Sequence, residues 1–218
     1  MADTEAPTRA APLTPDRMES LALALIEEEG IEGFSIRKLA DRLGCKAMSL
    51  YHHYPSKAHL MDAMLDRVLA DLPLPPPDLP WRERLARAAR AFHRIALAHP
   101  RFFPFFSTHR MNTRAGLIWL DGMLGLFRDA GFDEEQAARL FRAFGYFLMG
   151  AGLDETAGYS KGPSATAADA VLDAEVARVF PNVAAAGPFF RPGEREATFE
   201  LGLALLLDGA EQILEARP

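Results

Sequence analysis

Cysteine is almost absent from this chain, since Cys45 is the only one among 218 residues. A single thiol excludes a disulfide framework within the chain and a cysteine-rich zinc site, and it is typical of a reducing compartment. The chain also lacks an apolar run of the roughly 18 residues that a membrane span needs. Its first residues show no basic stretch followed by an apolar one, as a secretory signal would. These absences favour a cytoplasmic protein with no membrane partner.

No segment shows the alternation of apolar and polar residues that marks a half-buried strand, so we expect an all-α fold. The proline-rich run 72–80 is expected to be a stiff connector between two groups of helices. Helical patterns are predicted at about 14–29, 35–43, 46–54, 56–72, 81–99, 112–130, 133–157, 166–180 and 194–215.

The chain has no excess of positive charge, because 24 Lys and Arg stand against 30 Asp and Glu, a net charge of −6. Its distribution is uneven: residues 35–57 hold five cations against Asp41, a net +4, so the remainder carries −10. Salt confines each charge to about 8 to 10 Å, and a local basic surface on an acidic body can still bind phosphate. The other interpretation of these charges is an ordinary solvated helix face.

The first helices show clear start and stop signals. Thr14-Pro15-Asp16 begins a helix that Gly30 ends, Ser35 caps a second helix, and Gly44 can take the left-handed conformation that stops it. A longer helix followed by two short ones across a tight glycine turn is the arrangement that sets a helix into the major groove.

On the third helix Leu50 is expected to point inward. Tyr54 is expected to pack on the first helix and Tyr51 to face DNA. Lys57 is expected to open the next helix beside a phosphate. The outward or N-terminal positions, whose side chains can reach phosphates and base edges, are Lys46, Ala47, Met48, Ser49, Tyr51 and His52.

The run FSIRKLADRLGCKAMSLYHHYPSK resembles the helix-turn-helix signature of the TetR family of transcriptional repressors. Trp81, Phe92 and His99 keep the spacing of its tetracycline-repressor branch, and GFDEEQAARLFRAFGYFLMGAGLDE resembles that branch's dimer-interface helix. The resemblance implies an N-terminal three-helix DNA-binding domain and a C-terminal helical ligand-binding and dimerisation domain. We divide the chain accordingly into a disordered tail (1–13), a helix-turn-helix domain with its connecting helix (14–72) and an effector-binding and dimerisation domain (73–218).

The resemblance also implies roles for single residues. Arg37 corresponds to a base or phosphate contact and Lys57 to a phosphate contact, while the groove-facing positions are Ala47, Met48, Ser49, Tyr51 and His52. Adenine and guanine are recognised by side chains that make two hydrogen bonds to one base, and neither Ala47 nor Met48 can do so. This helix is therefore expected to read thymine methyls and DNA shape.

Aromatic residues concentrate around Pro100 and Pro104, where the two prolines are expected to break the helix and form a wide turn. Irregular backbone beside bulky apolar side chains can form an apolar cavity with a few polar groups, among them Arg110 and Asn112. At helical spacing the same aromatics also suit an ordinary core. The residues expected to bind an effector are Phe92, His99, Phe102, Phe103, Phe106, His109, Trp119, Phe144 and Phe147.

In the tetracycline-repressor branch one histidine and one asparagine anchor the drug and another histidine binds its magnesium. Without gaps, the corresponding positions of this chain are Pro73, Ala88 and Phe106. We therefore expect no metal, no cofactor and no tetracycline, but a small apolar or aromatic effector.

Small residues among large apolar ones predict close helix pairing near 133–157 and 194–215, across a two-fold axis. These helices could instead close only the monomer's own core. A homodimer would read a palindromic operator with half-sites about 34 Å apart. The predicted function is a repressor that binds such an operator and is released by its effector.

The alternative is an all-helical small-molecule-binding protein or enzyme without specific DNA binding. The sequence contains no HExxH motif, phosphate loop or Ser-His-Asp arrangement, which argues against an enzyme. An activator would share every motif with a repressor.

Overall fold

The computed structural model describes residues 12–109, 113–157 and 178–216, all of it helices, turns and connections without a strand. The tail 1–11, the side chains Arg110 and Asn112 and most of the helix expected at 166–180 lie outside these residues. The helices are α1 (Pro15–Glu29), α2 (Ile36–Leu43), α3 (Ala47–Tyr51), α4 (Lys57–Ala70), α5 (Trp81–Ala98), α6 (Phe103–Thr108), α7 (Arg114–Asp129), α8 (Glu134–Ala157), α10 (Pro181–Ala186) and α11 (Arg195–Glu215), with 3-10 turns η2 (Gly187–Phe190) and η3 (Pro192–Glu194).

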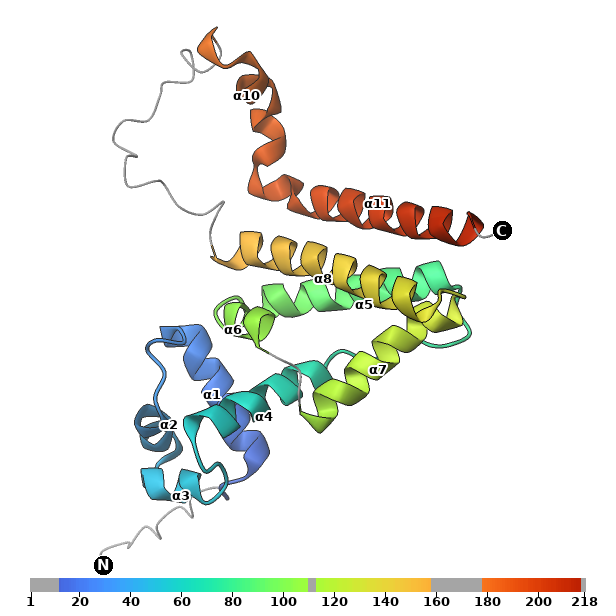
Figure 1. The fold of residues 1–218 in the computed structure, drawn as a ribbon. Helices are drawn as coiled ribbons and strands as arrows, with labels where there is room; N and C mark the ends of the chain where they lie inside the picture. The colour runs from blue at the N-terminus through green and yellow to red at the C-terminus, as the bar shows by residue number, and fades with distance from the viewer. Residues whose placement is uncertain (1–11, 110–112, 158–177, 217–218) are drawn as a thin grey trace, which may run out of the picture.

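Helices α1 to α4 form a head at the N-terminal end of the molecule (Figure 1). Its helix ends follow the expected signals: the Thr14 and Ser35 hydroxyls accept hydrogen bonds from the third residues of α1 and α2. Gly44 ends α2 at φ 69° and ψ 34°, a left-handed conformation that costs other residues free energy. This turn directs α3 across α2.

Helices α5 to α8 form the body, and α11 lies along α8 on the side away from the head (Figure 1). The connector 71–80 between α4 and α5 is not helical, as its prolines predict. None of the described helices is long and apolar enough to cross a membrane.

Two apolar cores hold these parts. The body core joins α5, α7, α8 and α11 through residues such as Phe127, Phe144 and Phe199. The head core contains the inner faces of α1 to α4, and Leu50 of α3 is buried in it as expected. It continues without a break into α5 and α6 through Phe92, Ile95, Ala96, Phe102, Phe103 and Phe106. Helix α6 is therefore shared between the head and the body.

Two elements differ from expectation. Helix α3 ends at Tyr51 instead of Tyr54, because the residue before Pro55 is disfavoured in a helix, although Tyr54 N still donates to Leu50 O at 2.9 Å. Where a wide turn was expected around Pro100 and Pro104, the short helix α6 begins at Phe103 and continues past Pro104. Pro104 is the second residue of α6, where a helix needs no backbone N–H.

Candidate nucleic-acid interface and effector cavity

The outer face of α3 presents Met48 and Tyr51, which are three residues apart and therefore on one side of the helix. Met48 is 67 % exposed and Tyr51 42 % exposed, while Leu50 on the opposite side is 2 % exposed. His52 follows at the C-cap and is also exposed, whereas Ala47 and Ser49 are half-buried. Large side chains in water on so short a helix have no packing role, so this face is available to a partner.

Arg37 and Lys46 lie beside that face. Arg37 is the second residue of α2 and Lys46 the N-cap of α3, and both are exposed. Within the described residues neither side chain has a hydrogen bond or an ion pair, so both cations are available to phosphate.

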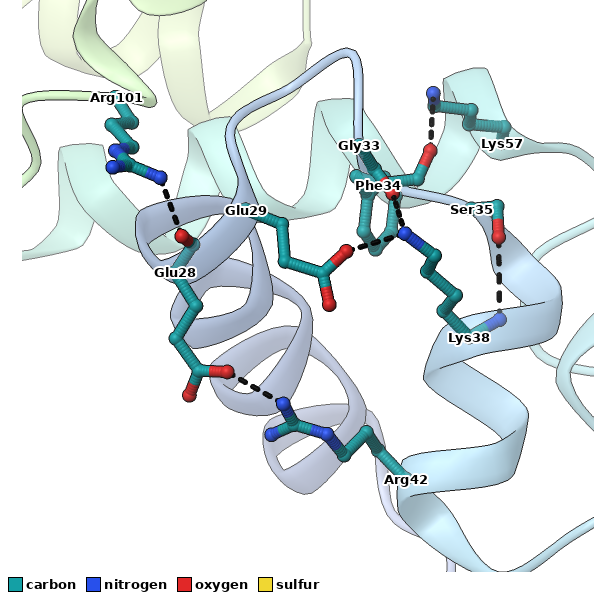
Figure 2. A network of polar contacts seen from close by, with 9 residues as sticks. All are labelled: Glu28, Glu29, Gly33, Phe34, Ser35, Lys38, Arg42, Lys57 and Arg101. Carbon is teal, nitrogen blue, oxygen red and sulfur yellow. Dashed lines mark hydrogen bonds and ion pairs between the residues drawn. The ribbon is translucent and has the colours of Figure 1, made fainter.

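Two further cations of residues 35–57 are already paired inside the head. Lys38 Nζ lies 2.5 Å from Glu29 Oε2 and Arg42 Nη2 lies 2.6 Å from Glu28 Oε2 (Figure 2). The hydrogen bond and charge of Arg42 hold the pKa of Glu28 below its usual value. The basic surface expected from the sequence is therefore partly neutralised by α1.

Lys57 has a contact that the sequence did not indicate. Its ammonium donates to Phe34 O at 3.0 Å and lies 5.2 Å from the centre of the Phe34 ring (Figure 2). The side chain fastens the start of α4 to the loop between α1 and α2. Because an ammonium has three protons and this one remains exposed, donors are left for a phosphate.

Tyr54 packs on α1, as expected, with its hydroxyl donating to Glu19. Burial, and next the Glu19 carboxylate, raise the pKa of this phenol. The contact fixes the end of the α3 segment on the first helix.

The body contains an apolar cavity of about 60 Å³ between α5, α7 and α8. Three residues of the expected effector set line it: Phe92, Trp119 and Phe144. The other lining residues are Leu85, Ala88, Ala89, Met123, Phe127, Phe141, Gly145, Leu148 and Met149. A signal for part of this group was present in the sequence, because Phe141, Phe144, Gly145 and Leu148 recur at helical spacing.

The other expected effector residues lie elsewhere. Phe102, Phe103 and Phe106 are fully buried in the head core. Phe147 stacks on Phe199 of α11, with 5.4 Å between the ring centres, and His99 caps the end of α5. His109 caps the end of α6 and bonds α4 instead. The difference arises because the α6 phenylalanines fill the junction of the two parts, where Phe103 and Phe106 pack on Phe92 behind the cavity wall and Phe103 lies against Gly152 of α8.

Two aspartates on one face of α4 bind the segment between α6 and α7. Asp62 Oδ1 lies 2.8 Å from His109 Nε2, and Asp66 Oδ1 accepts a hydrogen bond from the Thr113 hydroxyl at 2.5 Å. Thr113 is also the N-cap of α7. The sequence signal for this connection is the spacing of four between the aspartates, which places them on one side of a helix.

The connector packs on α7 as well. A Cβ on Gly122 would lie 2.2 Å from Leu74 Cδ1, so the Leu74 side chain lies directly over this glycine and would have to move for any larger residue. Within residues 12–109, 113–157 and 178–216, no group of three or more His, Cys, Asp or Glu side chains is placed to hold a metal ion.

The head presents a short exposed helix beside cations that have no partner among the described residues, and it is joined to a body with an apolar cavity. This combination is typical of a helix-turn-helix regulator with a ligand-binding body. Comparisons with known proteins agree. The family model of tetR-type bacterial regulatory proteins matches residues 20–64, and that of the tetracyclin repressor-like C-terminal domain matches residues 72–214.

Among curated proteins, the class A tetracycline repressor of transposon 1721 from Escherichia coli is 33 % identical over 203 residues, 90 % of each chain. A solved structure of a possible TetR family regulator from Streptomyces coelicolor A3(2) is 32 % identical, with a TM-score of 0.76 over 92 % of this chain and 100 % of that one. The ActR protein of Streptomyces coelicolor in complex with actinorhodin is 28 % identical, with a TM-score of 0.75 over 93 % and 98 % of the two chains. The chain belongs to the TetR family of ligand-responsive transcriptional regulators.

Proposed function

We propose that the protein is a repressor that binds a palindromic operator as a homodimer through α3 and is released when a small apolar molecule enters the body cavity. The exposure of Met48 and Tyr51, beside the unpaired Arg37 and Lys46, carries this proposal. This function requires no chemical step and no cofactor.

In this proposal Met48, Tyr51 and His52 enter the major groove, with Ala47 and Ser49 at the rim of the contact. Arg37, Lys46 and Lys57 bind phosphates on either side. Met48 and Ala47 offer only apolar surface, so they favour thymine methyls and a particular groove shape.

The DNA contact can be tested by fluorescence anisotropy on a sequence selected from a random pool. Arg37→Ala and Tyr51→Ala should each weaken binding by at least about tenfold, since each removes a phosphate or base contact. Arg114→Ala, which removes an exposed cation at the start of α7, away from the face of α3, should change it by less than about twofold. If the selection recovers no preferred sequence, the protein is instead a helical carrier of small molecules.

The proposed dimer pairs α8 and α11 with their copies. Leu201 and Leu205, one turn apart on α11, are 62 % and 64 % exposed, and Tyr146 of α8 is 69 % exposed. Apolar side chains at this spacing form a stripe that association would bury. Leu205→Glu should produce a monomer in sedimentation velocity, whereas Ile118→Glu, an equally exposed apolar position on α7, should leave the dimer intact.

The proposed effector is apolar because the described cavity lining has no charged side chain. A drug-sized pocket is roughly 300 to 1,000 Å³, so a cavity of about 60 Å³ must open to admit one. The wall formed by α7 is the one expected to move, because its N-terminal half exposes Leu117 and Ile118. The complex of ActR with actinorhodin supports a small organic ligand in this kind of body.

Movement of α7 reaches the head through α4. Thr113 at the start of α7 is bonded to Asp66, and Leu74 packs on Gly122, so a displaced α7 pulls on α4 and its connector. A 10- to 100-fold loss of DNA affinity needs only about 1.4 to 2.7 kcal/mol of coupling. The coupling must be reciprocal: saturating operator should weaken effector binding by the same factor, and an effector indifferent to operator would contradict this mechanism.

A further inference from the structure

Helix α1 ends in three consecutive glutamates, Glu27, Glu28 and Glu29, with no basic residue in its last turn. This is an unfavourable place for negative charge, because the C-terminus of a helix is the negative end of its dipole. The recognition of DNA described above does not use these residues, yet the structure gives each carboxylate a separate partner.

Glu28 and Glu29 bind the α2 side chains Arg42 and Lys38, which fixes α1 to the helix that precedes α3 (Figure 2). Lys38 also donates to Gly33 O at 2.8 Å, so the loop between α1 and α2 is held in the same network. On this side the glutamates organise the DNA-binding head.

Glu27 points the other way, toward the body. Its Oε2 accepts a hydrogen bond from Arg101 N and its Oε1 one from Phe102 N, both at 3.0 Å. These amides open α6, whose N-cap residue Phe102 supplies no side-chain cap. The Arg101 guanidinium in turn donates to Glu28 O, a carbonyl at the free end of α1 (Figure 2). A side chain from each segment therefore binds a backbone group of the other: the Glu27 carboxylate at the start of α6 and the Arg101 guanidinium at the end of α1.

Helix α6 is in contact with the wall of the cavity. The Phe103 and Phe106 rings lie 5.8 and 5.5 Å from the ring of Phe92, which lines it. In addition to the shared apolar core, polar contacts between described residues attach the head to the body at two separate places: α4 on the α6–α7 segment, and the end of α1 on the start of α6.

We propose that Glu27 is a positioning residue that sets the orientation of the DNA-binding head on the body, independently of α4. The inference rests on the proposed function, because a fixed orientation matters only if the head must match a groove. Removing the carboxylate leaves the Arg101 amide without an acceptor among the described residues and leaves Phe102 N with only His99 O, at 3.1 Å. The polar contact between the end of α1 and the start of α6 is then weakened.

The test compares full-length Glu27→Gln and Glu27→Ala with Glu32→Gln, an exposed glutamate in the adjacent loop whose side chain has no polar contact among the described residues. Spin labels on Asp41→Cys in the head and Arg87→Cys in the body, with Cys45→Ala, report the head-to-body distance by electron paramagnetic resonance. Both labelled positions are exposed. Mixing with excess unlabelled chain gives dimers that carry one labelled protomer.

The Glu27→Ala distance distribution should be clearly broader than wild type, and Glu27→Gln, which keeps one acceptor, should lie between them. Operator affinity should fall at least about fivefold in Glu27→Ala with an unchanged salt slope, because no phosphate contact is lost. Glu32→Gln should match wild type in both measurements.

A wild-type distance distribution in Glu27→Ala overturns the inference, and so does a broadened one with unchanged operator affinity. If the wild-type protein selects no DNA sequence, that result contradicts the proposed function and not the role of Glu27. The distance measurement needs no DNA and would still decide whether Glu27 orients the head.

Discussion

Met48 extends from α3 with no polar group to offer a base edge, yet it is the most exposed apolar side chain of the head. If it packs on thymine, the C5 methyl group carries the contact. Replacing the contacted thymine by uracil should weaken wild-type binding about fourfold, from roughly 0.8 kcal/mol per buried carbon.

The control variant is Met48→Ala, which lacks the side chain that contacts the methyl group. It should bind operators with thymine and with uracil equally in an anisotropy titration. If the variant keeps the full sensitivity to uracil, the methyl group is read by another residue.

Gly145 of α8 lines the cavity, and a Cβ built on it meets no atom within 4 Å. Gly145→Leu should therefore place its side chain in the cavity and raise stability by about 1 kcal/mol, since leucine is the better helix former. The binding of a neutral fluorescent naphthylamine probe should fall by at least about tenfold. Thermal unfolding and probe titration of the same sample check both effects, and unchanged probe binding would place the ligand elsewhere.

At this scale the sequence predicted local features well. Gly44 and Leu50 take the expected conformation and burial because turn chemistry and helical periodicity determine them, and Tyr54 packs on α1 as expected. It did not predict the pairing of Lys38 and Arg42 with the end of α1, nor Lys57 on Phe34. Those contacts depend on how the helices pack.

Among the elements, α11 is fastened to α5 by ion pairs, of which Arg90 with Glu200 is bidentate at 2.7 and 2.6 Å. The Arg90 hydrogen bond is the main reason that the pKa of Glu200 lies below its usual value. A depressed folded-state pKa gives stability that is present above the unfolded-state pKa and is lost as pH falls through the folded-state pKa. Both side chains are largely exposed, so this contribution is at most about 1 kcal/mol.

Urea unfolding should therefore show Arg90→Gln less stable than wild type near neutral pH, with the difference vanishing near pH 3. Arg94 is an exposed arginine of the same helix, and Arg94→Gln should have the same free energy of unfolding as wild type at every pH. A difference independent of pH would mean that Arg90 acts through packing instead of charge.

Element prediction succeeded where capping signals and apolar periodicity agree, as in α1, α5 and α8. It failed at α6, because Pro104 was taken as a break, although a proline at the second position starts a helix. The candidate cavity was predicted only in part for the same reason: with α6 misassigned, Phe102, Phe103 and Phe106 were expected to line it instead of the head core.

On the scale of the whole molecule, the acidic body leaves few cations for DNA. If Arg37, Lys46 and Lys57 of both protomers neutralise phosphates while Lys38 and Arg42 stay with their glutamates, about six contacts form. The plot of log affinity against log salt should then have a slope of about −5, compared with about −9 if all five cations engaged.

The slope can be measured by titrating operator at several salt concentrations. Arg37→Ala should lower its magnitude by about two per dimer, since one contact is lost in each protomer. A wild-type slope near −9 would show that Lys38 and Arg42 leave Glu29 and Glu28 on binding.

The continuity of the head core with α5 and α6 limits how this regulator can be taken apart. A chimera that joined this head to a foreign body at residue 72 would lose Phe92, Phe102, Phe103 and Phe106 from its interior, and with them several of the largest buried side chains. The DNA-reading unit is not an interchangeable module in this protein. Engineers who wish to graft its specificity onto another sensor must carry α6 and the end of α5 along with it.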